Sequence, residues 1–264
     1  MTNVIDLQAV SWRRQQENIL SDINWCVEKG EHWAILGLNG SGKTSLLNIV
    51  TGYSWPTAGH VRVLDQPFGK TDIRELRKSI GWVSSSLQER IRETERAEDI
   101  VVSGKYASIG LAYEEPAEAD FEKAFRIMKQ MRCSHLTGRA YQTCSQGERQ
   151  KLLIARGLMA SPDLLLLDES TSGLDFIARE ELLSSIQELI NQDGAPTIIF
   201  VTHHIEEVLP EFSRTLLLRD GTVFAKGSSE DVLTADNLSQ FFGMPVNVEW
   251  HQQRPWVSLD ERML

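Results

Sequence analysis

The sequence has 264 residues, of which 41% are hydrophobic and 24% are charged, a balance typical of globular proteins and not of disordered chains. Asp and Glu number 37 against 27 Lys and Arg, and the formal net charge of −10 argues against sequence-independent nucleic-acid binding, which needs a basic surface. The three cysteines lack metal-like spacing and indicate reduced thiols rather than a disulfide framework. No apolar run reaches the ~18 residues of a membrane span, and the N-terminus lacks a secretory pattern, so we expect a soluble chain.

Taken in chain order, the first third of the sequence is rich in strand patterns. Strands are expected at residues 4–10 and 22–27, which can pair as a hairpin, and at 33–36; a helix follows at 45–50 and further strands at 60–64 and 80–84. From about residue 90 to 160 the periodicity is helical instead. Helices are expected there at residues 90–102, 120–131 and 146–159, with an acidic connector at 112–119.

Strands return in the last third of the chain. They are expected at residues 164–167, 197–201, 215–218 and 222–225, with a helix at 178–190 between the first two. Such strand–helix alternation predicts an α/β fold with a largely parallel sheet, an N-terminal antiparallel β region and an inserted helical subdomain. We expect one domain over residues 1–243, with the insertion at about 90–160, and a C-terminal tail over 244–264.

A glycine-rich segment, Gly37–Thr44, carries the strongest local signal. It fits the pattern G-x-x-x-x-G-K-[ST] between an expected strand and an expected helix, which is the context that a phosphate-binding P-loop requires. An incidental glycine-rich turn is the alternative, and the flanking elements disfavour it. Lys43 is expected to reach the β- and γ-phosphates, and Thr44 to bind Mg²⁺. The predicted nucleotide-binding residues here are Gly37, Asn39, Gly40, Ser41, Gly42, Lys43, Thr44 and Ser45.

Two acidic residues follow the apolar run at 164–167. Asp168 and Glu169 would lie at the carboxyl end of a buried strand, where ligands of α/β proteins bind. A strand that merely ends in surface acids is the alternative. Beside a P-loop, we expect Asp168 to hold Mg²⁺ and Glu169 to polarise an attacking water. Together the two motifs predict a P-loop NTPase.

Three further motifs narrow the class. The pentapeptide Cys144–Glu148 resembles the LSGGQ signature of ABC-type ATPases, Ser172–Asp175 looks like the family's D-loop, and Thr202-His203 resembles its switch-histidine motif. The order and spacing of these motifs match the family across about residues 4–230. On this resemblance the chain is identified as a member of the ABC ATP-binding superfamily with a single nucleotide-binding domain. The same motifs disfavour an unrelated P-loop kinase.

The resemblance implies a site shared between two copies of the chain. In the family, the signature contacts the γ-phosphate of the ATP that the other protomer holds, and His203 would contact a γ-phosphate as a catalytic residue beside Glu169. The signature residues with this implied role are Ser145, Gln146, Gly147 and Glu148, and Asp175 joins them. Independently of the resemblance, Ser145 and Glu148 would form a capping box at a helix start. His204 is expected to face away from His203, because successive strand side chains alternate.

Two positions depart from the family's pattern. Where the family usually has a Mg²⁺-contacting glutamine after a strand, this chain has Ser85. Either Ser85 or Gln88 from a shifted loop would replace the glutamine, with Ser85 favoured, and a loop that only packs is the alternative. At the position of the adenine-stacking aromatic stands Arg14, whose planar guanidinium can stack on a base. Trp12 could stack instead, although packing against the sheet is an equal alternative.

The resemblance implies an ATP-binding and ATP-hydrolysing subunit of an ABC transporter, with ATP and Mg²⁺ as ligands. Its expected partners are a second copy of itself and separate transmembrane permease subunits, at the cytoplasmic face of the membrane and with no nucleic acid. The alternative is a soluble ABC ATPase that is not coupled to transport, with a regulatory or nucleic-acid-associated role. Similarities to molybdenum-transport subunits and to iron-siderophore and cobalamin importers conflict, so the transported substrate stays open.

Overall fold

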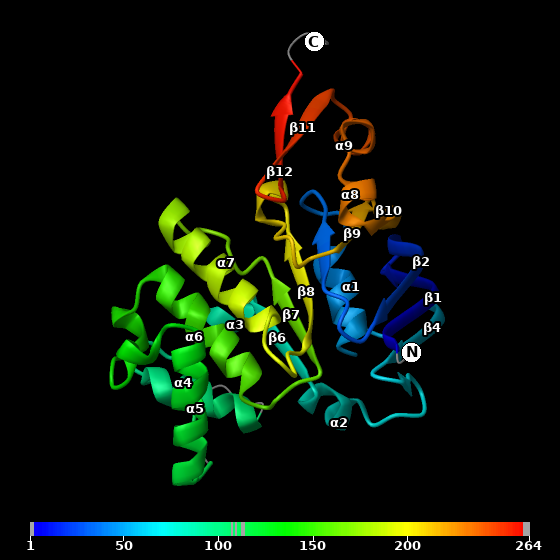
Figure 1. Ribbon diagram of the computed structural model, residues 1–264. Helices are drawn as coiled ribbons and strands as arrows, with labels where there is room; N and C mark the ends of the chain where they lie inside the picture. Colours follow the sequence, from blue (N-terminus) through cyan, green and yellow to red (C-terminus); the bar gives the residue numbers. More distant parts are fainter. Residues whose placement is uncertain (1–2, 107, 109, 112–113, 261–264) are drawn as a thin grey trace. The chain divides into compact units, whose positions relative to one another are not determined.

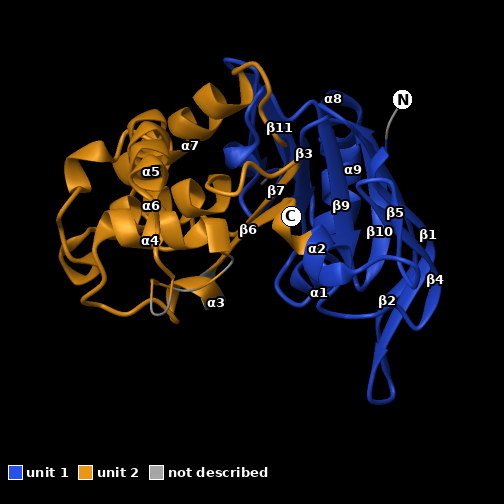
Figure 2. Cartoon of the chain, turned by 90° about the horizontal axis from the view of Figure 1, so that it is seen from below, with its two compact units in different colours: residues 1–76, 197–264 blue, residues 77–196 orange. Residues whose placement is uncertain are grey.

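The computed structural model describes residues 3–106, 108, 110–111 and 114–260, without the side chains of residues 85 and 86. The chain divides into two compact units (Figure 2). Unit 1 comprises residues 1–76 and 197–264, and unit 2 comprises residues 77–196. No helix among the described residues is long and apolar enough to cross a membrane.

Unit 1 contains the antiparallel region that the sequence predicts near its N-terminus. Strands β1 (Asn3–Arg14), β2 (Glu17–Glu28), β4 (Ala58–Val63) and β5 (Gln66–Pro67) form a sheet in the order β2-β1-β4-β5. β1 and β2 pair as a hairpin, with Leu7 opposite Trp25. Both of these side chains are buried, so the apolar residues of the two strands form one face of a core.

A second group of strands in unit 1 holds the predicted phosphate loop. β3 (Trp33–Leu36) pairs in parallel with β8 (Thr197–Thr202) on one side and β9 (Arg214–Arg219) on the other. β10 (Thr222–Ser228) then pairs with β9 in antiparallel fashion. All residues of β3 and β8 are buried, as expected for strands covered on both faces. Helix α1 (Lys43–Val50) lies in this unit, and α2 (Ile73–Lys78) contains the boundary between unit 1 and unit 2.

The C-terminal part of unit 1 contains short helices and a hairpin. After β8 come η4 (Ile205–Glu207), α8 (Ser229–Val232) and α9 (Ala235–Phe242), and then a hairpin of β11 (Val246–His251) and β12 (Arg254–Leu259). The hairpin forms a separate two-stranded sheet (Figure 1). The tail expected at residues 244–264 thus contains two paired antiparallel strands.

Unit 2 is built from two parallel strands and a group of helices. β6 (Ile80–Ser84) pairs with β7 (Leu164–Asp168), and Ser84 lies opposite Asp168 at the ends of the two strands. The helical elements are α3 (Ser85–Gln88), α4 (Ala97–Ser103), η1 (Gly104–Tyr106), α5 (Glu118–Gln130), η2 (Ser134–Leu136), η3 (Tyr141–Thr143), α6 (Gln146–Leu158) and α7 (Phe176–Ile190). Helices α4, α5 and α6 pack against one another.

The predicted helix at residues 90–102 is wrong in its first half, because α4 begins only at Ala97. Part of the preceding backbone is bonded to the segment at 139–142. The backbone carbonyl of Glu93 accepts from the Gln142 N–H, and that of Glu95 accepts from the Tyr141 N–H. The Ala97 N–H donates to the Arg139 carbonyl. These long-range bonds use the groups that an earlier helical turn would need.

Candidate functional site

The loop between β3 and α1 owes its shape to three glycines. Gly40 and Gly42 have φ angles of +82° and +103°, which side chains other than glycine rarely adopt. A Cβ at Gly37 would lie 2.4 Å from the Ser41 Oγ and 2.6 Å from the Leu218 carbonyl oxygen. The loop therefore wraps closely round on itself before α1 begins at Lys43.

Contacts with the rest of unit 1 hold the loop in place. The Gly221 N–H donates to the Ser41 carbonyl at 3.0 Å, and the Ser21 N–H donates to the Gly221 carbonyl at 2.8 Å. Lys43 is buried, and its Nζ donates to the carbonyls of Gly37 at 2.7 Å and Leu38 at 3.2 Å. The curl of the loop thus holds an ammonium group on its inner side.

Ser41 gives an independent indication that the loop fits an anion. Its hydroxyl is buried but has no hydrogen-bond partner within the part of the chain that the structure describes. A buried hydroxyl without a partner costs free energy unless a ligand satisfies it. Helix α1 also has Gly42 at its N-cap, no capping side chain and no acidic residue in its first turn. A phosphate at this helix N-terminus would satisfy these groups.

Two predicted adenine-contacting residues lie near the end of the first hairpin. Trp12 is half-buried and pairs with Leu20, whereas Arg14 is exposed and pairs with Glu17. The backbone register shifts after Trp12, so the hairpin end is irregular. Base stacking by Trp12 or Arg14 therefore stays a prediction.

The switch-histidine segment follows β8, which ends at Thr202. His203 is exposed, and its ring lies 4.1 Å from the ring of His204 between centroids. The expectation that His204 faces away from His203 is therefore wrong, because the strand alternation stops one residue earlier. Thr202 holds the backbone where the chain leaves β8. Its Oγ accepts from the His204 N–H at 3.1 Å, and its hydroxyl donates to the buried Glu207 carboxylate.

In unit 2, the acidic pair ends β7. Asp168 is buried, and Glu169 is half-buried with a φ of +52°. A glutamate in the left-handed region carries backbone strain, and strained residues of this kind concentrate at functional sites. The sequence indicated the two carboxylates but not this conformation, since the left-handed region favours Gly, Asn and Asp.

Ser85 and Gln88 are the two candidates to replace the family's glutamine, and they lie in different surroundings. The Ser85 side chain lies outside the described residues, although Ser85 directly follows Ser84, the partner of Asp168 in the strand register. Gln88 binds α6: its Nε2 donates to Gln146 at 3.0 Å, and its Oε1 accepts from Gln146 at 3.3 Å and from Gln150 at 3.1 Å. Gln88 is thus a partner of the signature helix, which its place in the sequence did not indicate.

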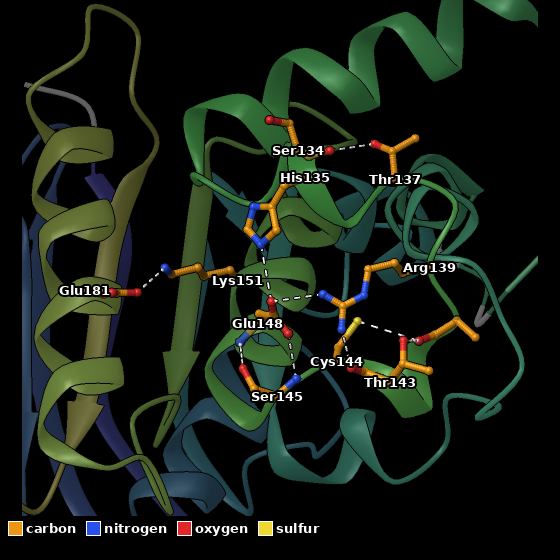
Figure 3. A network of polar contacts seen from close by, with 11 residues as sticks. Ser134, His135, Thr137, Arg139, Thr143, Cys144, Ser145, Glu148, Lys151 and Glu181 are labelled. Carbon is orange, nitrogen blue, oxygen red and sulfur yellow. Dashed lines mark hydrogen bonds and ion pairs between the residues drawn. The ribbon is translucent and has the colours of Figure 1, made fainter.

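The signature pentapeptide forms the start of α6, and the predicted capping box is confirmed (Figure 3). Ser145 is the N-cap: its Oγ accepts from the Glu148 N–H at 3.3 Å, and its own N–H donates to the Glu148 carboxylate at 2.7 Å. Partial burial alone would raise the pKa of Glu148, but the Ser145 N–H, His135 and Arg139 outweigh it, and the pKa lies below its usual value. Burial raises the pKa of the neighbouring Cys144 thiol.

The signature and D-loop segments meet within unit 2. Gly147 is buried, and a Cβ there would lie 3.1 Å from the Cβ of Ala178 in the first turn of α7. Asp175 is the N-cap of α7 and accepts from the Ala178 N–H at 2.9 Å. Gly147 therefore permits the starts of α6 and α7 to approach closely.

Comparisons with known proteins agree with these features. A family model described as ABC transporter matches residues 20–172, more than half of the chain. The chain belongs to this family. YlmA of Bacillus subtilis, an uncharacterised ABC transporter ATP-binding protein, is 48% identical, with 98% of each chain covered. The chain is accordingly an ABC transporter ATP-binding protein, a class that implies ATP hydrolysis.

Solved structures of ABC cassettes have the same fold. CbiO1 of Clostridium perfringens, part of the transporter complex CbiONQ, is 25% identical with a TM-score of 0.78, covering 91% of this chain and 94% of its own. MJ0796, a bacterial ABC transporter cassette solved as a dimer, is 25% identical with a TM-score of 0.73, covering 85% of this chain and 98% of its own. The α/β P-loop fold expected from the sequence is confirmed.

Proposed function

We propose that this ABC ATPase powers a separate membrane permease from the cytoplasmic face of the membrane. The observation that carries the nucleotide half of this proposal is the loop at Gly37–Lys43. It combines a buried ammonium group, a buried hydroxyl that has no hydrogen-bond partner among the described residues, and a helix N-terminus with no capping side chain. These are the groups that cradle a triphosphate.

The proposed chemistry is hydrolysis of ATP by water. Lys43 would bind the β- and γ-phosphates, and its charge would stabilise the negative charge that develops during transfer. Glu169 would accept a hydrogen bond from the attacking water and orient it, and His203 would contact the γ-phosphate. The left-handed backbone at Glu169 supports this role, because strained residues of this kind concentrate at functional sites.

Mg²⁺ is the proposed metal, and Thr44 and Asp168 are its proposed ligands. When bound, Mg²⁺ would neutralise charge on the phosphates. Within the described part of the chain there is no group of three or more His, Cys, Asp or Glu residues that could hold a metal ion. A sparse protein ligand set suits Mg²⁺, which typically binds through one or two protein groups, substrate phosphates and water.

The signature at Ser145–Glu148 is proposed to bind the nucleotide of a second copy of the chain. Its position at a helix N-terminus supports anion binding, and the related cassette MJ0796 is a dimer. Mixing Ser145→Arg with Lys43→Ala tests this arrangement. A mixed dimer has one site with both changes and one site with neither, so two inactive proteins should regain activity together.

Coupling to transport needs a test of its own. We expect the tagged chain, purified from detergent-solubilised membranes, to retain a multi-span protein, and mass spectrometry would identify it. A Glu169→Gln variant serves as the matched control, because its partner contacts should persist after hydrolysis is lost. A chain that is an active ATPase but retains no membrane protein would support the alternative of an ABC ATPase without transport.

A further inference from the structure

The signature of this chain carries a charge that the family's LSGGQ pattern lacks. Glu148 stands where that pattern has glutamine, so a carboxylate occupies the third position of α6. A carboxylate suits a helix N-terminus, because it interacts favourably with the helix dipole. It does not suit a site that receives a γ-phosphate, because two anions then share one helix end.

Glu148 also occupies the groups that a phosphate would use. Its carboxylate accepts the Ser145 N–H at 2.7 Å, and its backbone N–H donates to the Ser145 hydroxyl at 3.3 Å. An anion arriving at Ser145 must share or displace these bonds. The electrostatic repulsion between this anion and the carboxylate increases with the negative charge that remains uncompensated on Glu148.

Two basic side chains converge on the other oxygen of this carboxylate (Figure 3). Arg139 donates through Nη1 to Oε1 of Glu148 over 3.3 Å, and His135 Nε2 lies 3.2 Å from the same atom. Both come from the segment that precedes the signature in the chain. The second amino group of Arg139 donates to the Thr143 carbonyl, so Arg139 links Glu148 to the residue just before the pentapeptide.

Neighbouring cations of unit 2 are engaged elsewhere: Arg149, the residue after Glu148, donates to the Gln142 carbonyl at 3.1 Å, and two others pair with carboxylates. Lys151 of α6 binds Glu181 at 3.0 Å, and Arg132 binds Glu188. Glu148 is only partly exposed, at 24% of its side chain, so solvent screens its charge incompletely. The charge balance at the start of α6 therefore depends on Arg139, with His135 more exposed and less constrained.

We propose that Arg139 is a positioning residue of the signature: it compensates the charge of Glu148 and holds that carboxylate by its Oε1 side, which lets the helix start accept a phosphate. This inference rests on the proposed role of Ser145–Glu148 at the partner's nucleotide. Sequence position alone did not mark Arg139, because the pairing depends on the turn that brings residues 134–143 back onto α6.

The test measures dimer formation in a Glu169→Gln background, in which ATP should persist. The dissociation constant of the dimer with ATP and Mg²⁺ is obtained by analytical ultracentrifugation. Arg139→Ala should weaken the dimer roughly tenfold, the scale of one uncompensated charge near an anion. Adding Glu148→Gln to Arg139→Ala should restore it to within about threefold, since glutamine also forms a capping box but carries no charge.

Matched variants separate charge from structure. Arg139→Lys keeps the charge without the two-pronged contact and should fall between the parent and Arg139→Ala. Arg132→Ala removes another ion-paired arginine of the same unit and should leave the dimer unchanged. Thermal melting verifies folding; if Arg139→Ala does not fold, Arg139→Lys and the double variant carry the comparison.

Three outcomes contradict the proposal. A folded Arg139→Ala that dimerises like its parent removes any role for Arg139. Weakening that Glu148→Gln does not rescue would make Arg139 a structural link to Thr143 alone. A Glu169→Gln parent that stays monomeric with ATP rejects the shared site of the proposed function, and this inference with it.

Discussion

The N-termini of α1 and α6 are both proposed to bind phosphate, yet their sequences prepare them in opposite ways. α1 starts after glycine, with no capping side chain and no acid in its first turn. α6 starts after Ser145 and has Glu148 in a capping box that satisfies the helix with its own side chains. The first end is built for a ligand, whereas the second is already stable without one.

This difference separates two kinds of anion site. At α1, Lys43 is buried against the loop carbonyls of Gly37 and Leu38, and the buried Ser41 hydroxyl has no hydrogen-bond partner among the described residues, so a phosphate would meet groups that are already in place. At α6, Ser145 is exposed, and a phosphate competes with an internal carboxylate. We infer that nucleotide binds first at the P-loop of one chain and that the signature of the other closes on it, at a cost that the capping box sets.

The largest effect is expected for Glu169→Gln, which belongs to neither helix end. Removing the charge that orients water should lower hydrolysis by about 10²- to 10⁴-fold, the usual contribution of a general base, while ATP binding persists. Steady-state phosphate release and equilibrium nucleotide titration measure the two quantities. Turnover near that of the unchanged protein would move the catalytic role to His203 or another group.

Lys43→Ala probes the α1 end. Loss of a charge-assisted contact should weaken ATP binding roughly 10- to 100-fold, because such hydrogen bonds to charged groups contribute about 1.5–3 kcal/mol. Titration with a fluorescent ATP analogue measures it, with Lys29→Ala, at an exposed turn outside the loop, as control. An unchanged dissociation constant for Lys43→Ala would contradict the P-loop assignment.

Alanine substitutions at Gly37 and Gly147 compare how tightly the two helix ends are packed. Gly37→Ala places a Cβ 2.4 Å from a side-chain atom and 2.6 Å from a backbone carbonyl, whereas Gly147→Ala meets the Ala178 side chain at 3.1 Å. Overpacking costs typically 1–3 kcal/mol, and we expect Gly37→Ala to lower both stability and ATP affinity. Gly147→Ala should cost less stability. Chemical denaturation of both variants compares them, and the reverse order would contradict the described packing.

The smallest effects concern the α6 cap. Ser145→Ala should lower the free energy of unfolding by about 1 kcal/mol, the usual loss for an N-cap, and urea titration measures it.

A pH dependence is expected for Glu148. The folded-state pKa of Glu148 is lowered, so its stabilising contribution is present above about pH 4.5 and is lost as the pH falls below it. Glu148→Gln should therefore lose less stability than the unchanged protein between pH 6 and 3, in urea titrations. Equal losses would show that the capping carboxylate does not titrate as described.

The local residues of both helix ends could be predicted from the sequence, whereas the tertiary contacts of the α6 end could not. The P-loop at Gly37–Thr44 and the capping box at Ser145 are each formed by residues that are close together in the chain, so a local sequence pattern predicts them. The partners of Glu148 and of Gln88 depend on tertiary contacts and left no local pattern. The same limit explains the late start of α4, whose preceding backbone bonds to residues 139–142.

We propose that each ATP is held by the P-loop of one chain and the signature of another. The most direct measurement is the mass of Glu169→Gln in solution, by light scattering or ultracentrifugation, with ATP and Mg²⁺ and then without nucleotide. We expect a dimer with ATP and Mg²⁺ that dissociates when nucleotide is removed. A species that stays strictly monomeric at protein and ATP concentrations well above the ATP dissociation constant would contradict it.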